Sequence, residues 1–115
     1  MKLREAQEIL SAKLLTGSLD GEVNSACGCD LMSDVLAFVK DKALLLTGLM
    51  NPQVVRTAEM MDINTIVFVR GKQPDQALID LAASKNIVLM STEYPLYIAC
   101  GKLYEKGLGN KGGNA

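Results

Sequence analysis

The feature that most constrains the fold is an alternation of short apolar runs with segments of helical spacing, repeated from residue 23 onward. The runs at 43–48, 65–69 and 87–90 contain few polar residues and are too short for helices. Such runs are typical of strands whose two faces are both covered, and parallel strands need helical crossovers between them. The chain is therefore predicted to form a layered α/β/α single domain with a mainly parallel sheet of about 4–5 strands.

The order of the expected elements follows from the same pattern. We expect strands at 12–16, 23–29, 43–48, 65–69 and 87–90, and helices at 3–13, 31–40, 52–61, 74–84 and 95–106. Asn51 and Pro52 predict a helix start, because proline at the first helical position lacks an N–H that would be unpaired there anyway. We expect the next helix to start at Pro74 and Asp75, and the last helix to start at Pro95. Residues 1–107 are expected to form the domain, and the glycine-rich segment 108–115 a disordered C-terminal tail.

The composition argues against several classes of protein. Twelve basic and thirteen acidic residues give a net charge of −1, and aromatic residues are few, so we expect no nucleic-acid binding. No apolar run is long enough to span a membrane. Histidine is absent, which removes the commonest general base, and no catalytic constellation is visible, so we do not expect an enzyme. Three cysteines, with no secretion signal, indicate reduced thiols and a cytoplasmic location.

Small or polar residues follow each of the four predicted parallel strands. In open α/β sheets ligands bind beyond the carboxyl ends of the strands, where helix N-termini favour anions. We therefore predict a site for a small polar or phosphorylated ligand, with Lys72 adding positive charge nearby. Its predicted residues are Asp30, Ser33, Asp34, Thr47, Gly48, Asn51, Arg70, Gly71 and Thr92. The structural alternative is that tight turns require such residues. No glycine-rich dinucleotide or Walker-type motif is present.

The three cysteines allow a second hypothesis. Cys27 and Cys29 are two apart on a predicted strand and so share a face, while Cys100 lies within a predicted helix. We expect no cofactor, since free cysteines are commonly small core residues. The alternative is a redox or iron–sulfur sensor, in which the three cysteines bind a cluster with Asp30 or an exogenous fourth ligand, or across a dimer.

The segment after Cys29 raises two further questions. Asp30 and Asp34 are four residues apart and could act as an acid–base pair, but a helix cap at Asp30 or Ser33 is the simpler interpretation. The predicted helix 31–40 is apolar on most sides, whereas a helix covering a sheet needs one apolar stripe. The excess predicts a second buried face, and we expect a homodimer.

Four segments resemble a known family. Cys-Asp-Leu-Met-Ser-Asp-Val-Leu-Ala (29–37), Leu-Leu-Thr-Gly (45–48), Asn-Pro-Gln-Val-Val-Arg-Thr-Ala (51–58) and Ile-Val-Phe-Val-Arg-Gly-Lys-Gln-Pro (66–74) resemble the DRTGG domain family. Residues 99–108 look like its closing helix. The Asp-Arg-Thr-Gly-Gly string that names the family does not occur in this chain.

The resemblance implies regulation rather than catalysis. The family is similar to the non-catalytic N-terminal domain of HPr kinase/phosphorylase, and it occurs joined to CBS domains and to phosphotransacetylase-like enzymes. Stand-alone members resembling this chain occur in anaerobes near iron hydrogenase and signalling genes, which implies a signalling or hydrogenase-related protein partner. We expect a ligand-sensing regulatory module.

Overall fold

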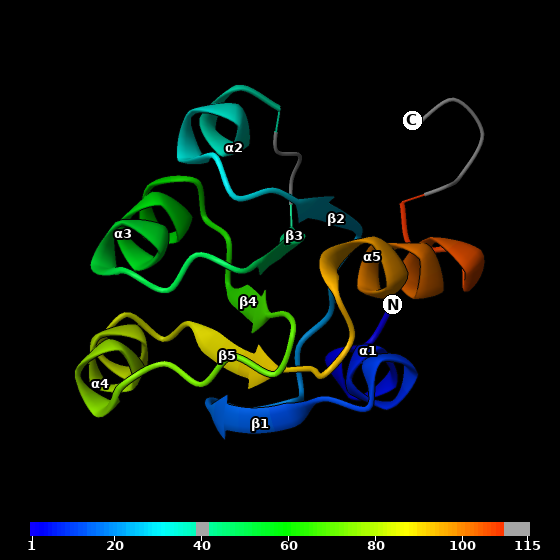
Figure 1. Ribbon diagram of the computed structural model, residues 1–115, viewed down its shortest axis with the longest axis horizontal. Helices are drawn as coiled ribbons and strands as arrows, with labels where there is room; N and C mark the ends of the chain where they lie inside the picture. The colour runs from blue at the N-terminus through cyan, green and yellow to red at the C-terminus, as the bar shows by residue number, and fades with distance from the viewer. Residues whose placement is uncertain (39–41, 110–115) are drawn as a thin grey trace.

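Five strands form one sheet in the order β1-β5-β4-β3-β2 (Figure 1). The computed structural model describes residues 1–38 and 42–109. The strands are β1 (Lys13–Thr16), β2 (Ser25–Gly28), β3 (Ala43–Thr47), β4 (Thr65–Phe68) and β5 (Val88–Ser91). Strands β2 to β5 are parallel neighbours, and β1 pairs antiparallel with β5. The predicted mainly parallel sheet is confirmed.

Helices cover both faces of the sheet. They are α1 (Leu3–Leu10), α2 (Met32–Phe38), α3 (Pro52–Met60), α4 (Gln76–Ser84) and α5 (Leu96–Glu105). Helices α2, α3 and α4 pack on one face, and α1 and α5 pack on the other (Figure 1). The layered α/β/α arrangement is confirmed.

The central strands are apolar throughout because both of their faces are buried. Along β3, Leu44 and Leu46 enter the core beneath α1 and α5, while Leu45 enters the core beneath α2, α3 and α4. Successive side chains on a strand point to opposite faces, so a strand between two helix layers needs apolar residues at every position. Burial on both faces therefore explains the apolar run at 43–48 from which the fold was predicted.

Two of the three predicted proline helix starts are corrected. Pro52 is the first residue of α3, and the Asn51 side chain accepts a hydrogen bond from the Gln53 N–H, as expected. Helix α4, however, begins at Gln76 rather than at Pro74. The Asp75 carboxylate accepts from the Leu78 N–H at 2.9 Å, so Asp75 is the cap and its backbone stays extended. Pro95 likewise is the cap residue of α5 and lies outside the helix.

The prediction that Asp30 or Ser33 caps α2 is wrong, because the helix begins at Met32. The carbonyl of Leu31 accepts from the Val35 N–H at 3.3 Å, which makes Leu31 the last residue before the helix. Ser33 lies inside the helix, and the Asp30 side chain bonds elsewhere. The predicted end of this helix at Lys40 lies outside the described residues.

The C-terminal segment begins within the packed structure. Leu108 is buried in the core beneath α1 and α5, and its N–H donates to the Leu103 carbonyl at 3.1 Å. The folded part therefore extends past the predicted boundary at 107, and the remainder of the predicted tail, 110–115, lies outside the described residues.

One long-range hydrogen bond ties the N-terminal segment to the far end of the chain. The buried Thr92 hydroxyl, just after β5, donates to the Leu10 carbonyl at 2.6 Å, across 82 positions in sequence. Together with the pairing of β1 with β5, this bond holds α1 and β1 against the sheet.

Within the described ranges, 1–38 and 42–109, no helix has the length and apolar character needed to cross a membrane.

Candidate functional site at the carboxyl ends of the strands

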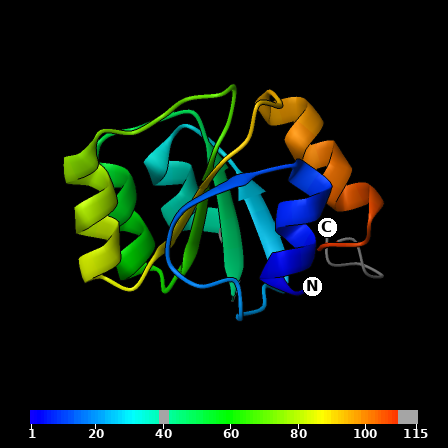
Figure 2. The ribbon, with the colours of Figure 1, turned by 90° about the horizontal axis from the view of Figure 1, so that it is seen from below.

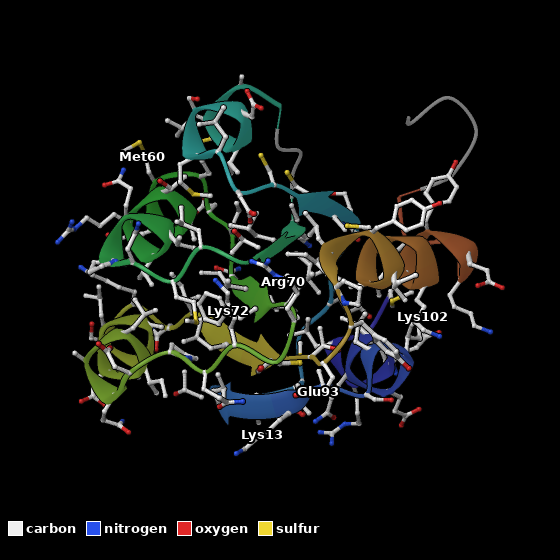
Figure 3. The ribbon with its side chains drawn as sticks, viewed as in Figure 1. Lys13, Met60, Arg70, Lys72, Glu93 and Lys102 are labelled. Carbon is white, nitrogen blue, oxygen red and sulfur yellow. The ribbon has the colours of Figure 1, made fainter. Side chains whose placement is uncertain are left out.

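The segments that follow β2, β3 and β4 meet at one edge of the sheet. Their residues Asp30, Thr47, Gly48, Arg70 and Lys72 make direct contacts with one another, and we call them the strand-end cluster. Figure 3 shows Arg70 and Lys72 near the centre of this view, between α3 and α4 on one side and α5 on the other. The cluster is where parallel-sheet topology predicts a ligand site.

Asp30 anchors the cluster. One of its carboxylate oxygens accepts from the Gly48 N–H at 2.7 Å and from the Thr47 hydroxyl at 2.9 Å. The Gly48 hydrogen bond is the main reason that the pKa of Asp30 is lowered. Burial opposes it, and the Thr47 bond, Arg70 and Lys72 add smaller lowering effects. The Thr47 hydroxyl in turn accepts from the Leu49 N–H at 3.1 Å. The β3 end is therefore fixed by a carboxylate that stays ionised.

Two cations lie against Gly48. A Cβ built on Gly48 would stand 2.8 Å from a guanidinium nitrogen of Arg70, so the missing side chain makes room for the arginine head. The Lys72 ammonium donates to the Gly48 carbonyl at 3.0 Å. Lys72 was expected only to add charge near the site, and its direct contact with the cluster was not predicted. Its position two residues after Arg70 is the signal that could have revealed it.

Arg70 lies in a backbone conformation that arginine rarely adopts. Its φ is +62° and that of Gly71 is +67°, and the Lys72 N–H donates to the Val69 carbonyl at 3.3 Å, which closes a turn of the I′ kind. For a residue other than glycine, left-handed φ costs about 1 kcal/mol. The Arg70 N–H donates to the Tyr94 carbonyl at 2.9 Å and so helps to hold the turn in place. Strained residues held by their surroundings often mark functional sites.

Several predicted site residues do not join the cluster. Thr92 turns its hydroxyl to Leu10, the Gly71 N–H donates to the Thr92 carbonyl at 2.8 Å, and the Asn51 side chain caps α3. Ser33 and Asp34 are exposed on α2, and in the described part of the chain no hydrogen bond links them to the cluster. Asp30, Thr47, Gly48 and Arg70 are the predicted residues that the fold brings together.

Two carboxylates lie near the two cations of the cluster: Asp30 interacts electrostatically with both, and a Cβ built on Gly71 would stand 2.8 Å from the Glu93 carboxylate. In residues 1–38 and 42–109, no carboxylate lies within ion-pair distance of Arg70 or Lys72; the two ion pairs there are Arg4–Asp20 and Lys85–Glu59. The Asp30 carboxylate is already bonded to Thr47 and Gly48. A guanidinium and an ammonium side by side suit the oxygens of a phosphate or carboxylate. The arrangement can thus bind an anion.

The three thiols lie on different sides of the sheet. Cys27 and Cys29 pack toward the α2 layer, whereas Cys100 packs toward the core beneath α1 and α5 and lies against Gly28. Burial is the main cause of a raised pKa for both Cys27 and Cys100, which disfavours the reactive thiolate. This packing does not favour a cluster that joins the three cysteines of one chain, and the iron–sulfur alternative stays a prediction. No group of three histidine, cysteine or carboxylate side chains suited to a metal occurs in the described ranges.

Comparison with known proteins finds a solved structure of similar fold. No family model and no curated protein matches the sequence. Among solved structures, the CBS and DRTGG domains of the regulatory region of Clostridium perfringens pyrophosphatase, in complex with its activator diadenosine tetraphosphate, superpose with a TM-score of 0.71 at 15% identity. The match covers 89% of this chain and 45% of that one. The comparison shows a likeness of fold, and membership of the DRTGG domain family stays a prediction.

Proposed function

We propose that this protein is a non-catalytic regulatory module that senses a small phosphorylated ligand through Arg70 and Lys72. The observation that carries the proposal is the strand-end cluster: two cations held against Gly48 with no carboxylate paired to either in the described ranges. Holding like charges together costs free energy, and an anion placed between them would recover it.

The structural relative supports the same class of ligand. Its regulatory region binds diadenosine tetraphosphate, a polyanionic nucleotide, as an activator. A polyphosphate chain carries several oxygens that guanidinium and ammonium groups recognise. We therefore propose polyphosphates, free or attached to adenosine, as ligands of the cluster.

Calorimetric titration tests this function. The purified protein is titrated at low salt with inorganic pyrophosphate, ATP and diadenosine tetraphosphate in turn. We expect at least one to bind, with an affinity that weakens as salt screens the charges. Arg70→Ala should lower the affinity about tenfold, which corresponds to one charge-assisted hydrogen bond at a partly exposed site.

The matched control is Arg56→Ala, which removes the same charge from an exposed position on α3. Binding to this variant should equal that of the wild type. An equal loss in both variants would mean that only net charge matters, and failure of all three compounds to bind would remove the proposed ligand class.

We further propose that the protein forms a homodimer through the outer surface of α2 and α3. Leu31 and Leu36 are 57% and 43% exposed, and Met60 on the adjacent α3 is 72% exposed. These exposed apolar side chains on two adjacent elements are the surface that we propose is covered by a second copy of the chain. Ligand binding at the strand ends would shift this interface, since Asp30 lies only two residues before the start of α2.

Sedimentation of two variants tests the dimer. Leu36→Lys should yield monomers, while Tyr97→Lys, at an 86% exposed position on α5, should leave the assembly unchanged. Dissociation by the α5 change alone would move the interface to the other face of the sheet.

We keep a second proposal for the cysteines, an iron–sulfur cluster shared between two chains. Cys27 and Cys29 of two chains could hold a shared iron–sulfur cluster, and the visible spectrum with iron and sulfide content of anaerobically purified protein would decide it. A cytoplasmic location and a signalling or hydrogenase-related partner stay predictions.

A further inference from the structure

A cavity of about 380 Å³ lies at the opposite edge of the sheet, where the parallel strands begin. Figure 2 shows the segment between β1 and β2 passing along this edge. Residues from that segment, from α1 and from the turns that precede β3, β4 and β5 line the cavity. Its volume is in the range of small-molecule sites, and the strand-end cluster contributes no residue to it.

A buried hydroxyl without a partner belongs to this cavity. Thr65, the first residue of β4, lines it and is 1% exposed, and its hydroxyl oxygen has no hydrogen bond to any residue that the structure describes. Its neighbours in the sheet register are Leu44 and Val88, which offer no polar side-chain atom. Thr65 alternates with Ile66, so its side chain points to the α1 side, where Leu3 also lines the cavity. Leaving a buried hydroxyl unpaired is costly, and a ligand that bonds to it would remove that cost.

The remaining walls combine apolar surface with groups of both charges. Leu3, Val23, Ala43 and Val88 supply aliphatic surface. Lys42 and Glu22 bring one positive and one negative side chain, and neither is in an ion pair within the described ranges. Asn64 and Asn86 add two carboxamides, each able to donate and accept hydrogen bonds.

We propose that this cavity binds a small zwitterion, a free amino acid with an aliphatic side chain. Lys42 would bind the carboxylate, Glu22 the ammonium group, and Val23 and Val88 would contact the side chain. The Thr65 hydroxyl donates to a carboxylate oxygen. A plain anion would leave Glu22 opposed to it, and a hydrocarbon would leave Thr65 unpaired, so the mixed lining favours a ligand that carries both charges and an apolar group.

The test uses L-leucine as the probe, followed by amide chemical shifts of the full-length protein. Two analogues of the same shape serve as ligand controls: 4-methylpentanoate lacks the amino group, and 3-methylbutylamine lacks the carboxylate. We expect leucine to shift the amides of residues 64, 65 and 86, and each analogue to bind at least about tenfold more weakly, the loss expected for one charged contact. Binding of an analogue as tight as leucine, or no shift with leucine, overturns the proposal.

Substitution of Thr65 gives a second readout that does not depend on the ligand controls. Thr65→Val keeps the shape and removes the hydroxyl, so the free protein should melt at a higher temperature while leucine binds roughly fivefold more weakly. Thr65→Ser keeps the hydroxyl and should retain most of the affinity. Equal leucine affinity in the wild type and in Thr65→Val would contradict the proposal. Pyrophosphate titration of Thr65→Val should be unchanged, which separates this site from the strand-end cluster.

Discussion

The two edges of the sheet differ in how the ends of the strands are covered. At the carboxyl edge, the protein's own groups close the strand ends: Asp30 bonds to Thr47 and Gly48, and Lys72 bonds to the Gly48 carbonyl. At the amino edge, a cavity remains and the Thr65 hydroxyl has no partner. The comparison teaches that the two edges offer different groups to a ligand: two cations outside any ion pair of the described residues at the carboxyl edge, and a cavity with an unbonded hydroxyl at the amino edge.

The largest expected effect on the free energy of unfolding comes from removing the Asp30 carboxylate at the carboxyl edge. Asp30→Ala leaves the buried Thr47 hydroxyl and the Gly48 N–H without their acceptor, which should lower the free energy of unfolding by about 2 kcal/mol. Urea denaturation measures this loss. Asp30→Asn keeps an acceptor oxygen and should lose much less. A neutral result for Asp30→Ala would mean that water replaces the carboxylate, and that the edge is less closed than the geometry indicates.

Part of the stabilisation that the Asp30 carboxylate provides should depend on pH, and this part is smaller than the loss in Asp30→Ala. Because the Gly48 hydrogen bond lowers the pKa of Asp30 below its ordinary value of 3.8, the folded state favours the ionised carboxylate. That contribution is fully present above the ordinary value and is lost as the pH falls through the lowered one. Unfolding free energies measured at neutral and acid pH should therefore fall more for the wild type than for Asp30→Asn. Parallel pH profiles for the two proteins would contradict the assignment.

A substitution that relieves the strain at Arg70 should raise the free energy of unfolding, whereas the Asp30 substitutions lower it. Arg70→Gly removes the guanidinium and also the penalty of left-handed φ, so the free energy of unfolding should rise by up to about 1 kcal/mol while pyrophosphate binding falls. Arg70→Ala keeps the strain and should lose binding without that gain. Thermal melts of the two variants make the comparison, and identical melting temperatures would show that the turn stores no strain.

The smallest effect is expected at the amino edge. Asn86 also has a left-handed φ, of +57°, but asparagine tolerates this conformation. Asn86→Gly should change the free energy of unfolding by no more than a few tenths of a kcal/mol. A gain as large as that of Arg70→Gly would show that asparagine is as strained at position 86 as arginine is at position 70.

Local patterns in the sequence predicted the fold well and the site in part. The runs around Leu45 and Val67 marked buried strands, because burial on both faces leaves no room for polar residues. Sheet topology then placed Asp30, Gly48 and Arg70 at one edge. The order of strands does not tell where a side chain points. Thr92 follows β5 as expected, but its hydroxyl donates to the Leu10 carbonyl instead of joining the cluster.

The amino-edge cavity gave no signal in the sequence. Its lining comes from five separate segments, and each polar residue taken alone is typical of a solvent turn. Thr65 was predicted correctly as the start of a strand. That its hydroxyl lacks a partner depends on Leu44 and Val88 beside it, which only the register of the sheet reveals.

The bond between Thr92 and Leu10 has a consequence for how the chain acquires its fold during synthesis. Strand β1 leaves the ribosome early, but β5, its partner in the sheet, follows only after most of the domain has been made. Until then α1 and β1 carry apolar surface with nothing to cover it, while β2, β3 and β4 can already pair in the order in which they emerge. Closing so long a loop comes at an entropic cost, so the joining of these first residues to the sheet should be a late event in folding.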